Sequence, residues 1–430
     1  MRRTPKQEIV DFFSFSSAPR DDLAGLRTFR QRDWKHALGW LDDAGLAFYF
    51  LQKIRDMNVT DSIPPWVVSR LEHNFTANRQ RVGDMAQRFD SLNKQFNGAG
   101  VRYAVLKGLS LIPQFCPDAC LRHQGDFDYL VDDKSLATAQ RVVVEAGYIP
   151  KPSISKQGSI FLMPGTGNAS RSAAQYSARS PHAVELHLDI WDGDLNRPRL
   201  PSLFSVNRTR THQWDGLTFP VLTDEDAFLL QVLHACHHLF SYWIRISCLL
   251  EIGFFLKRRA SDTALWDGVA QRVGDNFVLR ELVVVISELV AQVFAAPLPH
   301  LVRTWGNGVR PVTRVWIENY AQDCALCELP AYEFRLLPKT KLILFLLQQY
   351  RDDMPAGKVL VRNRLIPSSR LGRIVSSVRN NPSLVLNRQW WKRQLLLRRV
   401  IFHALSGLRY LCEIPRWLWL NRDRAHSTAT

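Results

Sequence analysis

The stretch GDFDYLV at residues 125–131 places two aspartates one residue apart in an otherwise apolar run. Such a run is typical of a β-strand, and in a strand residues i and i+2 point to the same face of the sheet. Asp126 and Asp128 would therefore lie side by side, where each raises the pKa of the other unless a cation lies between them. Any fold predicted for this chain has to explain why a strand carries this pair.

The segments around this strand predict its structural setting. Residues 20–98 repeat apolar side chains at intervals of three and four, which is typical of helices, and Asn97-Gly98 ends that pattern. Helices are also predicted from Ser135 to Gly147 and after Thr223, which with Asp226 has the spacing of a capping box. Besides DFDYLV, strands are predicted at VRYAVLK (101–107), at Tyr148-Ile149, around IFLM (160–163) and at AVELHLDI (183–190), with a mobile loop after IFLM.

The fold class is therefore predicted as α+β, with a small mixed sheet between helical regions. The predicted organisation is an N-terminal helical region (1–98), an α/β core (99–192), a helical region that completes a cleft (193–330) and a basic C-terminal helical region (331–430).

No apolar run reaches the roughly 18 residues that a membrane-spanning helix needs. The nearest candidate, residues 282–298, is interrupted by Glu288 and Gln292 and is predicted to be a buried helix. The first residues lack the apolar core of a signal peptide, so we expect a cytoplasmic protein.

The net charge of +16 is concentrated at the C-terminal end. Residues 331–430 contain 19 Lys and Arg but 5 Asp and Glu, and apolar residues interleave with the basic ones, as in QWWKRQLLLRRVIFHALSGLRYL (389–411). This pattern is compatible with solvated helices, with peripheral binding to an anionic membrane surface, or with nucleic acid. A membrane surface fits it better than nucleic acid does.

The seven cysteines do not indicate a structural metal. The close pairs Cys116/Cys120 and Cys324/Cys327 differ in spacing and are far apart, so reduced thiols are expected. His234 and His238 have the i, i+4 spacing of some zinc sites, but Ala235 stands where an HExxH motif needs glutamate. Packing, or a place beside the cleft, is the interpretation that we favour for these histidines.

Paired carboxylates on one strand face suit Mg²⁺ or Mn²⁺, which prefer oxygen ligands and share them with substrate phosphates. Such chemistry needs a third carboxylate, for which Glu185 is the candidate and Asp189 and Asp192 are rivals. Arg122, four residues before Asp126, could contact a phosphate or form a salt bridge.

Three motifs in order resemble a nucleotidyltransferase family of the DNA polymerase β superfamily: Leu106-Lys107-Gly108, then Arg122-x-x-Gly-Asp126-x-Asp128, then Glu185-x-His187. The resemblance covers about residues 30–260, including the helix VLTDEDAFLLQVLHACHH. It implies that Asp126, Asp128 and Glu185 are catalytic metal ligands. The nucleotide-binding residues that we predict are Lys107, Gly108, Ser110, Arg122 and His187.

Two departures from the superfamily pattern affect these roles. Leu109 follows Gly108 where serine is common, so a serine arrives only at Ser110, and the third acid is glutamate where aspartate is common. The function predicted is transfer of an NMP group from an NTP to an acceptor by a two-metal mechanism. The alternative is an adaptor on the same fold that binds nucleotide or a partner without turnover.

Overall fold

The fold was analysed in a computed structural model, which describes residues 4–16, 23–151, 158–163, 176, 182–191, 200–240, 244–326, 397, 401, 404–405, 408 and 411–422. The predicted loop after IFLM, Asp192, Cys327 and most of the basic C-terminal region lie outside these residues.

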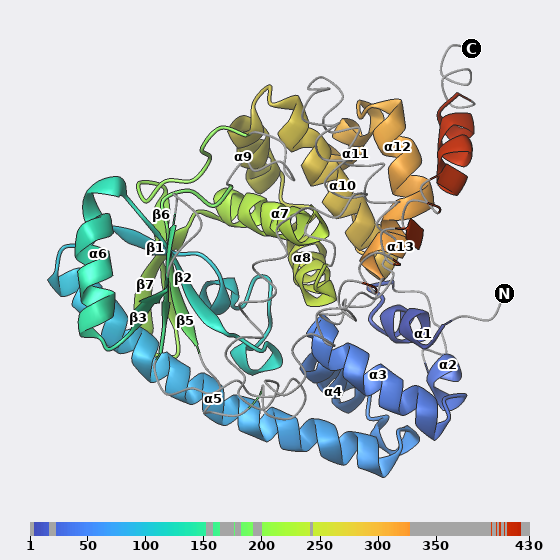
Figure 1. The fold of residues 1–430 in the computed structure, drawn as a ribbon, viewed down its shortest axis with the longest axis horizontal. Helices are drawn as coiled ribbons and strands as arrows, with labels where there is room; N and C mark the ends of the chain where they lie inside the picture. Colours follow the sequence, from blue (N-terminus) through green and yellow to red (C-terminus); the bar gives the residue numbers. More distant parts are fainter. Residues whose placement is uncertain are drawn as a thin grey trace. The chain divides into compact units, whose positions relative to one another are not determined.

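A mixed sheet of seven strands forms the centre of the fold, with the strand order β3-β4-β5-β2-β1-β7-β6 (Figure 1). The central strand β2 pairs in antiparallel fashion with β1 and in parallel with β5. The strands are β1 (Tyr103–Val105), β2 (Asp126–Val131), β3 (Ile149–Lys151), β4 (Gly158–Leu162), β5 (Ala183–His187), β6 (Thr209–Trp214) and β7 (Leu217–Leu222). The predicted mixed sheet between helical regions is confirmed.

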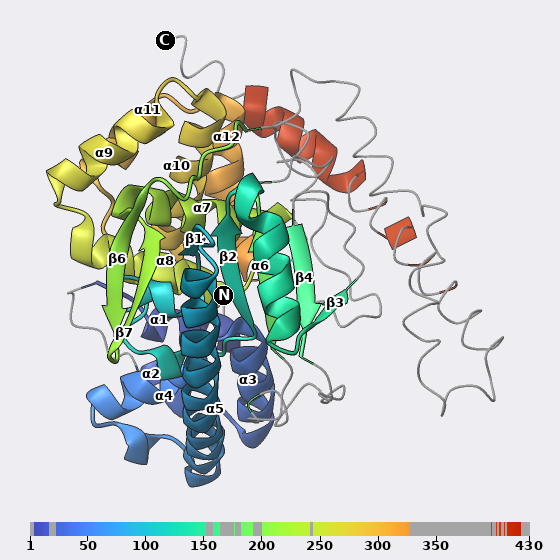
Figure 2. The same cartoon turned by 90° about the vertical axis from the view of Figure 1, so that its left-hand side faces the viewer.

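Two helices cover one face of this sheet, as Figure 2 shows: α5 (Pro65–Gly98) and α6 (Asp133–Glu145). Phe89 of α5 packs against Phe127, with ring centroids 5.6 Å apart, and stacks on Tyr129 at 6.2 Å. The odd-numbered positions of β2 are thus buried against α5. The even-numbered positions, which include the two aspartates, face the other way.

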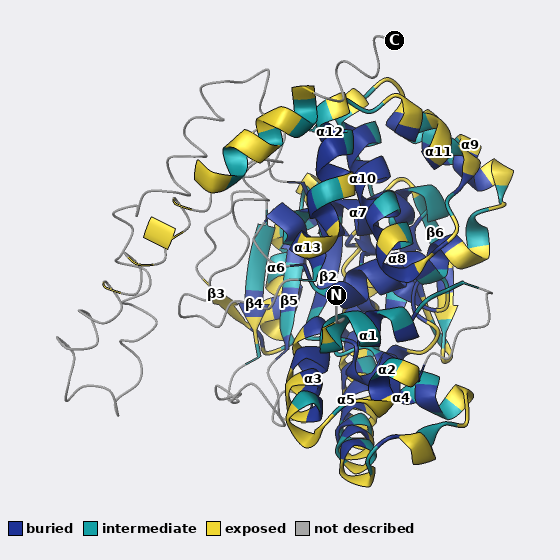
Figure 3. Cartoon of the chain, turned by 90° about the vertical axis from the view of Figure 1, so that its right-hand side faces the viewer, coloured by how far each residue is buried: buried dark blue, intermediate teal, exposed yellow. Residues whose placement is uncertain are grey.

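The remaining helices lie before and after the sheet in sequence. They are α1 (Pro5–Phe12), α2 (Ala24–Arg27), α3 (Gln31–Ala44), α4 (Ala47–Asp56), α7 (Asp224–Phe240), α8 (Ile246–Arg259), α9 (Thr263–Val273), α10 (Phe277–Phe294), α11 (His300–Asn307), α12 (Pro311–Trp316) and α13 (Gln322–Ala325). Short 3₁₀ turns are formed by Thr60–Ser62, Gly108–Leu111 and Ala119–Leu121, and a π turn by Ile317–Ala321. Helices α8 and α10 are largely buried (Figure 3). A buried helix was predicted for residues 282–298, and the helix ends at Phe294, four residues earlier than predicted.

Two compact units make up the fold. The first comprises residues 1–192, 200–236 and 245–307 and contains the whole sheet; the second comprises residues 193–199, 237–244 and 308–430.

Two local predictions are wrong. Residues 193–330 are not entirely helical, because β6 and β7 form a hairpin that extends the sheet beyond residue 192. The capping box at Thr223 does not form: the hydroxyl of Thr223 is buried without a hydrogen-bond partner among the described residues. The carboxylate of Asp226 instead accepts hydrogen bonds from Arg208 at 2.9 Å and Arg272 at 2.6 Å, which removes it from the helix end.

Candidate active site

The parallel pairing of β2 with β5 brings the predicted acids together. In its register Asp128 lies directly beside Glu185, and Asp126 lies two pairs earlier, beside Ala183. His187 follows Glu185 by two residues and therefore shares its face of the sheet. We call Asp126, Asp128 and Glu185, with Lys107 and His187, the carboxylate cluster.

Asp128 is the most enclosed member of this cluster, since its side chain is 1% exposed. Lys107, two residues after β1, donates to its Oδ1 at 2.7 Å, and the Nε2 of His187 lies 3.1 Å from the same oxygen. His187 is also 3.5 Å from Glu185. Ligand atoms of Asp128, Glu185 and His187 all lie within 4.8 Å of one another, close enough to hold a cation together.

The pKa values of the carboxylates shift in different directions. Burial alone would raise the pKa of Asp128, but the ammonium of Lys107 and the bond to His187 bring that pKa below its ordinary value. Burial and the charge of Asp128 raise the pKa of Asp126, and burial together with both aspartates raises the pKa of Glu185. The cluster therefore holds more negative charge than the described cations neutralise.

The turn after Lys107 has a conformation that favours glycine. Gly108 has φ +66°, and a Cβ at this position would collide with the side-chain amide of Gln124. That amide donates to the carbonyl of Asp126 at 2.8 Å and so ties the turn to the first residue of β2. The hydroxyl of Ser110 donates to the carbonyl of Lys107 at 3.2 Å, which stabilises the turn internally.

Two roles were considered for Arg122, a phosphate contact and a salt bridge. The structure contains the salt bridge. Its Nε donates to Glu251 of α8 at 2.9 Å, with side-chain exposures of 12% and 1%. The hydroxyl of Tyr49 donates to the same carboxylate oxygen at 3.2 Å and lies 3.0 Å from the sulfur of Cys116. We call these four residues the Glu251 network. Burial would lower the pKa of Arg122, but Glu251 raises it above its ordinary value, so this arginine stays charged.

Sequence reasoning missed Arg245, which precedes α8. Its Nη2 is 3.4 Å from the carbonyl of His123, while its Nε is buried without a hydrogen-bond partner in the described part of the chain. Its charge lowers the pKa of Asp126, which places the guanidinium near the carboxylate cluster. The arginine packs so closely on Gly45, at φ +72°, that a Cβ there would collide with it. No motif marks Arg245, because it lies more than a hundred residues from β2.

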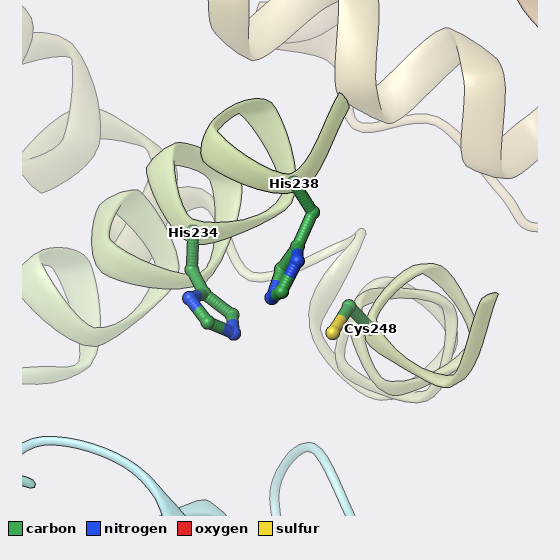
Figure 4. A group of neighbouring side chains, drawn as sticks. All are labelled: His234, His238 and Cys248. Carbon is green, nitrogen blue, oxygen red and sulfur yellow. The ribbon is translucent and has the colours of Figure 1, made fainter. Parts of the chain in front are cut away.

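A second group of potential metal ligands lies on α7 and α8. Figure 4 shows His234, His238 and Cys248, whose ligand atoms are all within 4.8 Å of one another. The two predicted histidines thus share one side of α7. Cys248 was not singled out from the sequence. Asp189, a rival for the third carboxylate, accepts a hydrogen bond from the backbone of Trp191 at 3.1 Å.

A family of uncharacterised nucleotidyltransferases matches residues 30–294, which include the sheet and both clusters. The chain belongs to this family. No curated protein and no solved structure matches it. The match confirms the resemblance carried by the three sequence motifs and supports a general role in nucleotidyl transfer. Within the residues described, no helix is long and apolar enough to cross a membrane.

Proposed function

We propose that this nucleotidyltransferase family member is an active enzyme that transfers an NMP group from an NTP to an acceptor hydroxyl or phosphate with the help of divalent cations. The observation that supports the proposal is the pairing of Asp128 with Glu185 on adjacent strands, with Asp126 on the same strand as Asp128. This arrangement explains why a strand carries two aspartates.

The donor set fits Mg²⁺ or Mn²⁺, because carboxylate oxygens are their preferred ligands. The raised pKa values of Asp126 and Glu185 indicate negative charge that a bound cation would compensate. Asp126, Asp128 and Glu185 would hold two such ions. These ions would lower the pKa of the attacking hydroxyl and neutralise charge on the leaving pyrophosphate. His187 and Lys107 keep Asp128 ionised and oriented.

The triphosphate would bind beside the turn formed by Lys107, Gly108 and Ser110. We assign a positioning role to Arg122, because its guanidinium is bonded to Glu251. Arg245 is the better candidate for a phosphate contact, since its buried Nε lacks a partner in the described structure and it lies near Asp126. Guanidinium groups bind phosphate oxygens strongly.

The first test is transfer of ³²P from each of the four α-labelled NTPs into acceptors in a cell extract, with Mg²⁺ or Mn²⁺. Label in an acceptor with the wild type, but not with Asp126→Asn, is the expected result and identifies the base. Nucleotide binding without transfer to any acceptor would favour the adaptor. For an adaptor, Asp128→Asn would leave partner binding intact. For an enzyme, the same variant would form no product.

A separate test addresses Arg245. We expect Arg245→Met to raise KM for the NTP about tenfold or more, as for loss of a hydrogen bond to a charged group. Arg258→Met is the matched control, because Arg258 is an exposed arginine of the same helix region. Equal KM values for the two variants would exclude the phosphate contact.

We further propose that the C-terminal region binds an anionic membrane surface, where the acceptor would be found. Residues 411–422 are helical, and the hydroxyl of Tyr320 donates to Glu413 at 2.8 Å. Large apolar side chains are exposed along the described positions of this region: Leu397, Ile401, Leu405, Leu408, Leu411, Leu418 and Trp419. Together with the basic excess of residues 331–430, they match an interfacial helix better than a nucleic-acid surface.

Vesicle flotation tests this second proposal. The full chain should float with vesicles that contain anionic lipid and remain behind with neutral ones. The triple variant Leu411→Gln, Leu418→Gln, Trp419→Gln should bind less, whereas Leu162→Gln, at an exposed apolar residue of β4, should bind normally. Unchanged binding of the triple variant, or of a chain truncated near residue 335, would contradict it.

A further inference from the structure

Helices α7 and α8 hold a second set of ligand side chains in fixed positions. Ring stacking of Phe228 on Phe255, with centroids 5.4 Å apart and planes at 19°, packs α7 against α8. His234 and Cys248 project from these two helices within 4.8 Å of each other. His238 follows His234 by one turn of the same continuous helix, so helix geometry itself places it on the same side (Figure 4).

The chemistry of these atoms differs from that of the carboxylate cluster. Two imidazoles and a thiol are soft or borderline ligands, which suit Zn²⁺ and are poor partners for Mg²⁺. Ligand bonds of 2.0–2.3 Å in a tetrahedral zinc site put neighbouring ligand atoms about 3.3–3.8 Å apart. The ligand atoms of this group lie within 4.8 Å of one another, so their separations exceed that spacing by about 1 Å at most.

Cys248 also differs from Cys236, a buried cysteine on α7 that is not part of the group. Burial raises the pKa of both thiols, but to about 11 for Cys248 and further for Cys236. The carboxylate of Glu251 raises the pKa of Cys248 further, and the nearby cations Arg122, Arg245 and Lys107 lower it.

We propose that His234, His238 and Cys248 form a binding site for Zn²⁺ that is separate from the carboxylate cluster. Binding forms one bond from zinc to each imidazole and one to the sulfur, and the thiol proton goes to solvent with no change of oxidation state. Three protein ligands leave a fourth coordination position for water or for an oxygen of a bound ligand.

The test is the metal content of the full chain, purified without chelator and analysed for zinc and other transition metals by mass spectrometry. We expect one equivalent of zinc in the wild type. The single variants His234→Asn, His238→Asn and Cys248→Ser should each lose most of it. The matched controls are His237→Asn and Cys236→Ser, which change the same residue types on α7 and should keep it.

Replacement by Co²⁺ identifies the ligands directly. The wild type and Cys236→Ser should show a thiolate-to-cobalt charge-transfer band, and Cys248→Ser should lack it. A melting curve of each variant by circular dichroism separates loss of a ligand from loss of folding. The proposal fails if the wild type retains no metal, if Cys248→Ser keeps the band, or if the zinc is lost on Asp128→Asn and kept on His234→Asn.

Discussion

Charged side chains are buried in two neighbouring places, the Glu251 network and the carboxylate cluster, and the balance between acids and cations differs between them. In the Glu251 network one carboxylate meets one guanidinium and one hydroxyl, so the charges balance. In the carboxylate cluster three acids share a single bonded ammonium, and two of them have raised pKa values. A buried ion pair with balanced charge fixes the position of chain segments, whereas an excess of buried negative charge is typical of a site that binds a cation. Four predictions test this contrast.

The largest effect is expected from breaking the balanced pair. Arg122→Met leaves Glu251 buried without its counter-ion and should lower the free energy of unfolding by about 4 kcal/mol. The double variant Arg122→Met, Glu251→Gln removes both charges and should recover more than half of that loss. Urea unfolding measures both. If Arg122→Met raised KM for NTP without loss of stability, Arg122 would belong to the nucleotide site instead.

A smaller loss, about 3 kcal/mol, is expected for Lys107→Met. Asp128 then loses its ammonium but keeps the bond to His187, which limits the penalty. Lys107→Arg retains the charge and serves as the control. A loss below about 1 kcal/mol for Lys107→Met would mean that Asp128 is neutral in the folded protein.

The next prediction concerns pH and metal. Asp126 and Glu185 have folded-state pKa values above their ordinary values of 3.8 and 4.5, so the stability that they contribute is present below those values. It is lost as the pH rises through the raised values. Mg²⁺ should restore it, by about 1.4 kcal/mol at ten times its Kd at pH 8 and by much less at pH 4. Thermal melts with and without Mg²⁺ at both pH values measure this, and equal shifts would argue against the cluster as the binding site.

The smallest effect sharpens the comparison because its sign is reversed. Asp126→Asn removes one of the excess charges and should stabilise the metal-free chain by about 1 kcal/mol, although it abolishes transfer. Asp90→Asn, at a half-buried acid of α5 paired with Lys94, should leave transfer unchanged. Destabilisation by Asp126→Asn would show that this acid supports the fold in the way Glu251 does.

The acid strand and its neighbour were predictable because they depend on local pattern. Alternation in DFDYLV and AVELHLDI defines both strands, and the order of the motifs identifies the family. The β6–β7 hairpin was missed although a signal exists: Asp215-Gly216 joins the two strands, with φ +46° and +76°, and an Asp-Gly pair between strands is typical of a hairpin turn. Polar residues in TRTHQW hid the alternation of an edge strand.

Other features depend on partners that the sequence does not reveal. Arg122 donates to Glu251, which lies 129 residues later in the chain. Asp226 accepts hydrogen bonds from Arg208 and Arg272 and does not cap the helix with Thr223. A charged side chain has many candidate partners in the chain, and only the fold selects one. For the same reason, Cys248 could not be linked to the histidines of α7 by spacing alone.

Helix α5 has a consequence for the order in which the chain folds. Asn78 donates to the carbonyls of Cys120 and Arg122, and Arg81 donates to that of Gln124, across only 42 to 44 residues. The same helix supports β2 from behind through Phe89. Closing these loops loses less conformational entropy than closing the 129-residue loop to Glu251. We therefore expect the segment that carries the aspartates to form its contacts with α5 before α8 packs against it during folding. In pulsed hydrogen exchange during refolding, amides of α5 and β2 should gain protection before those of α8.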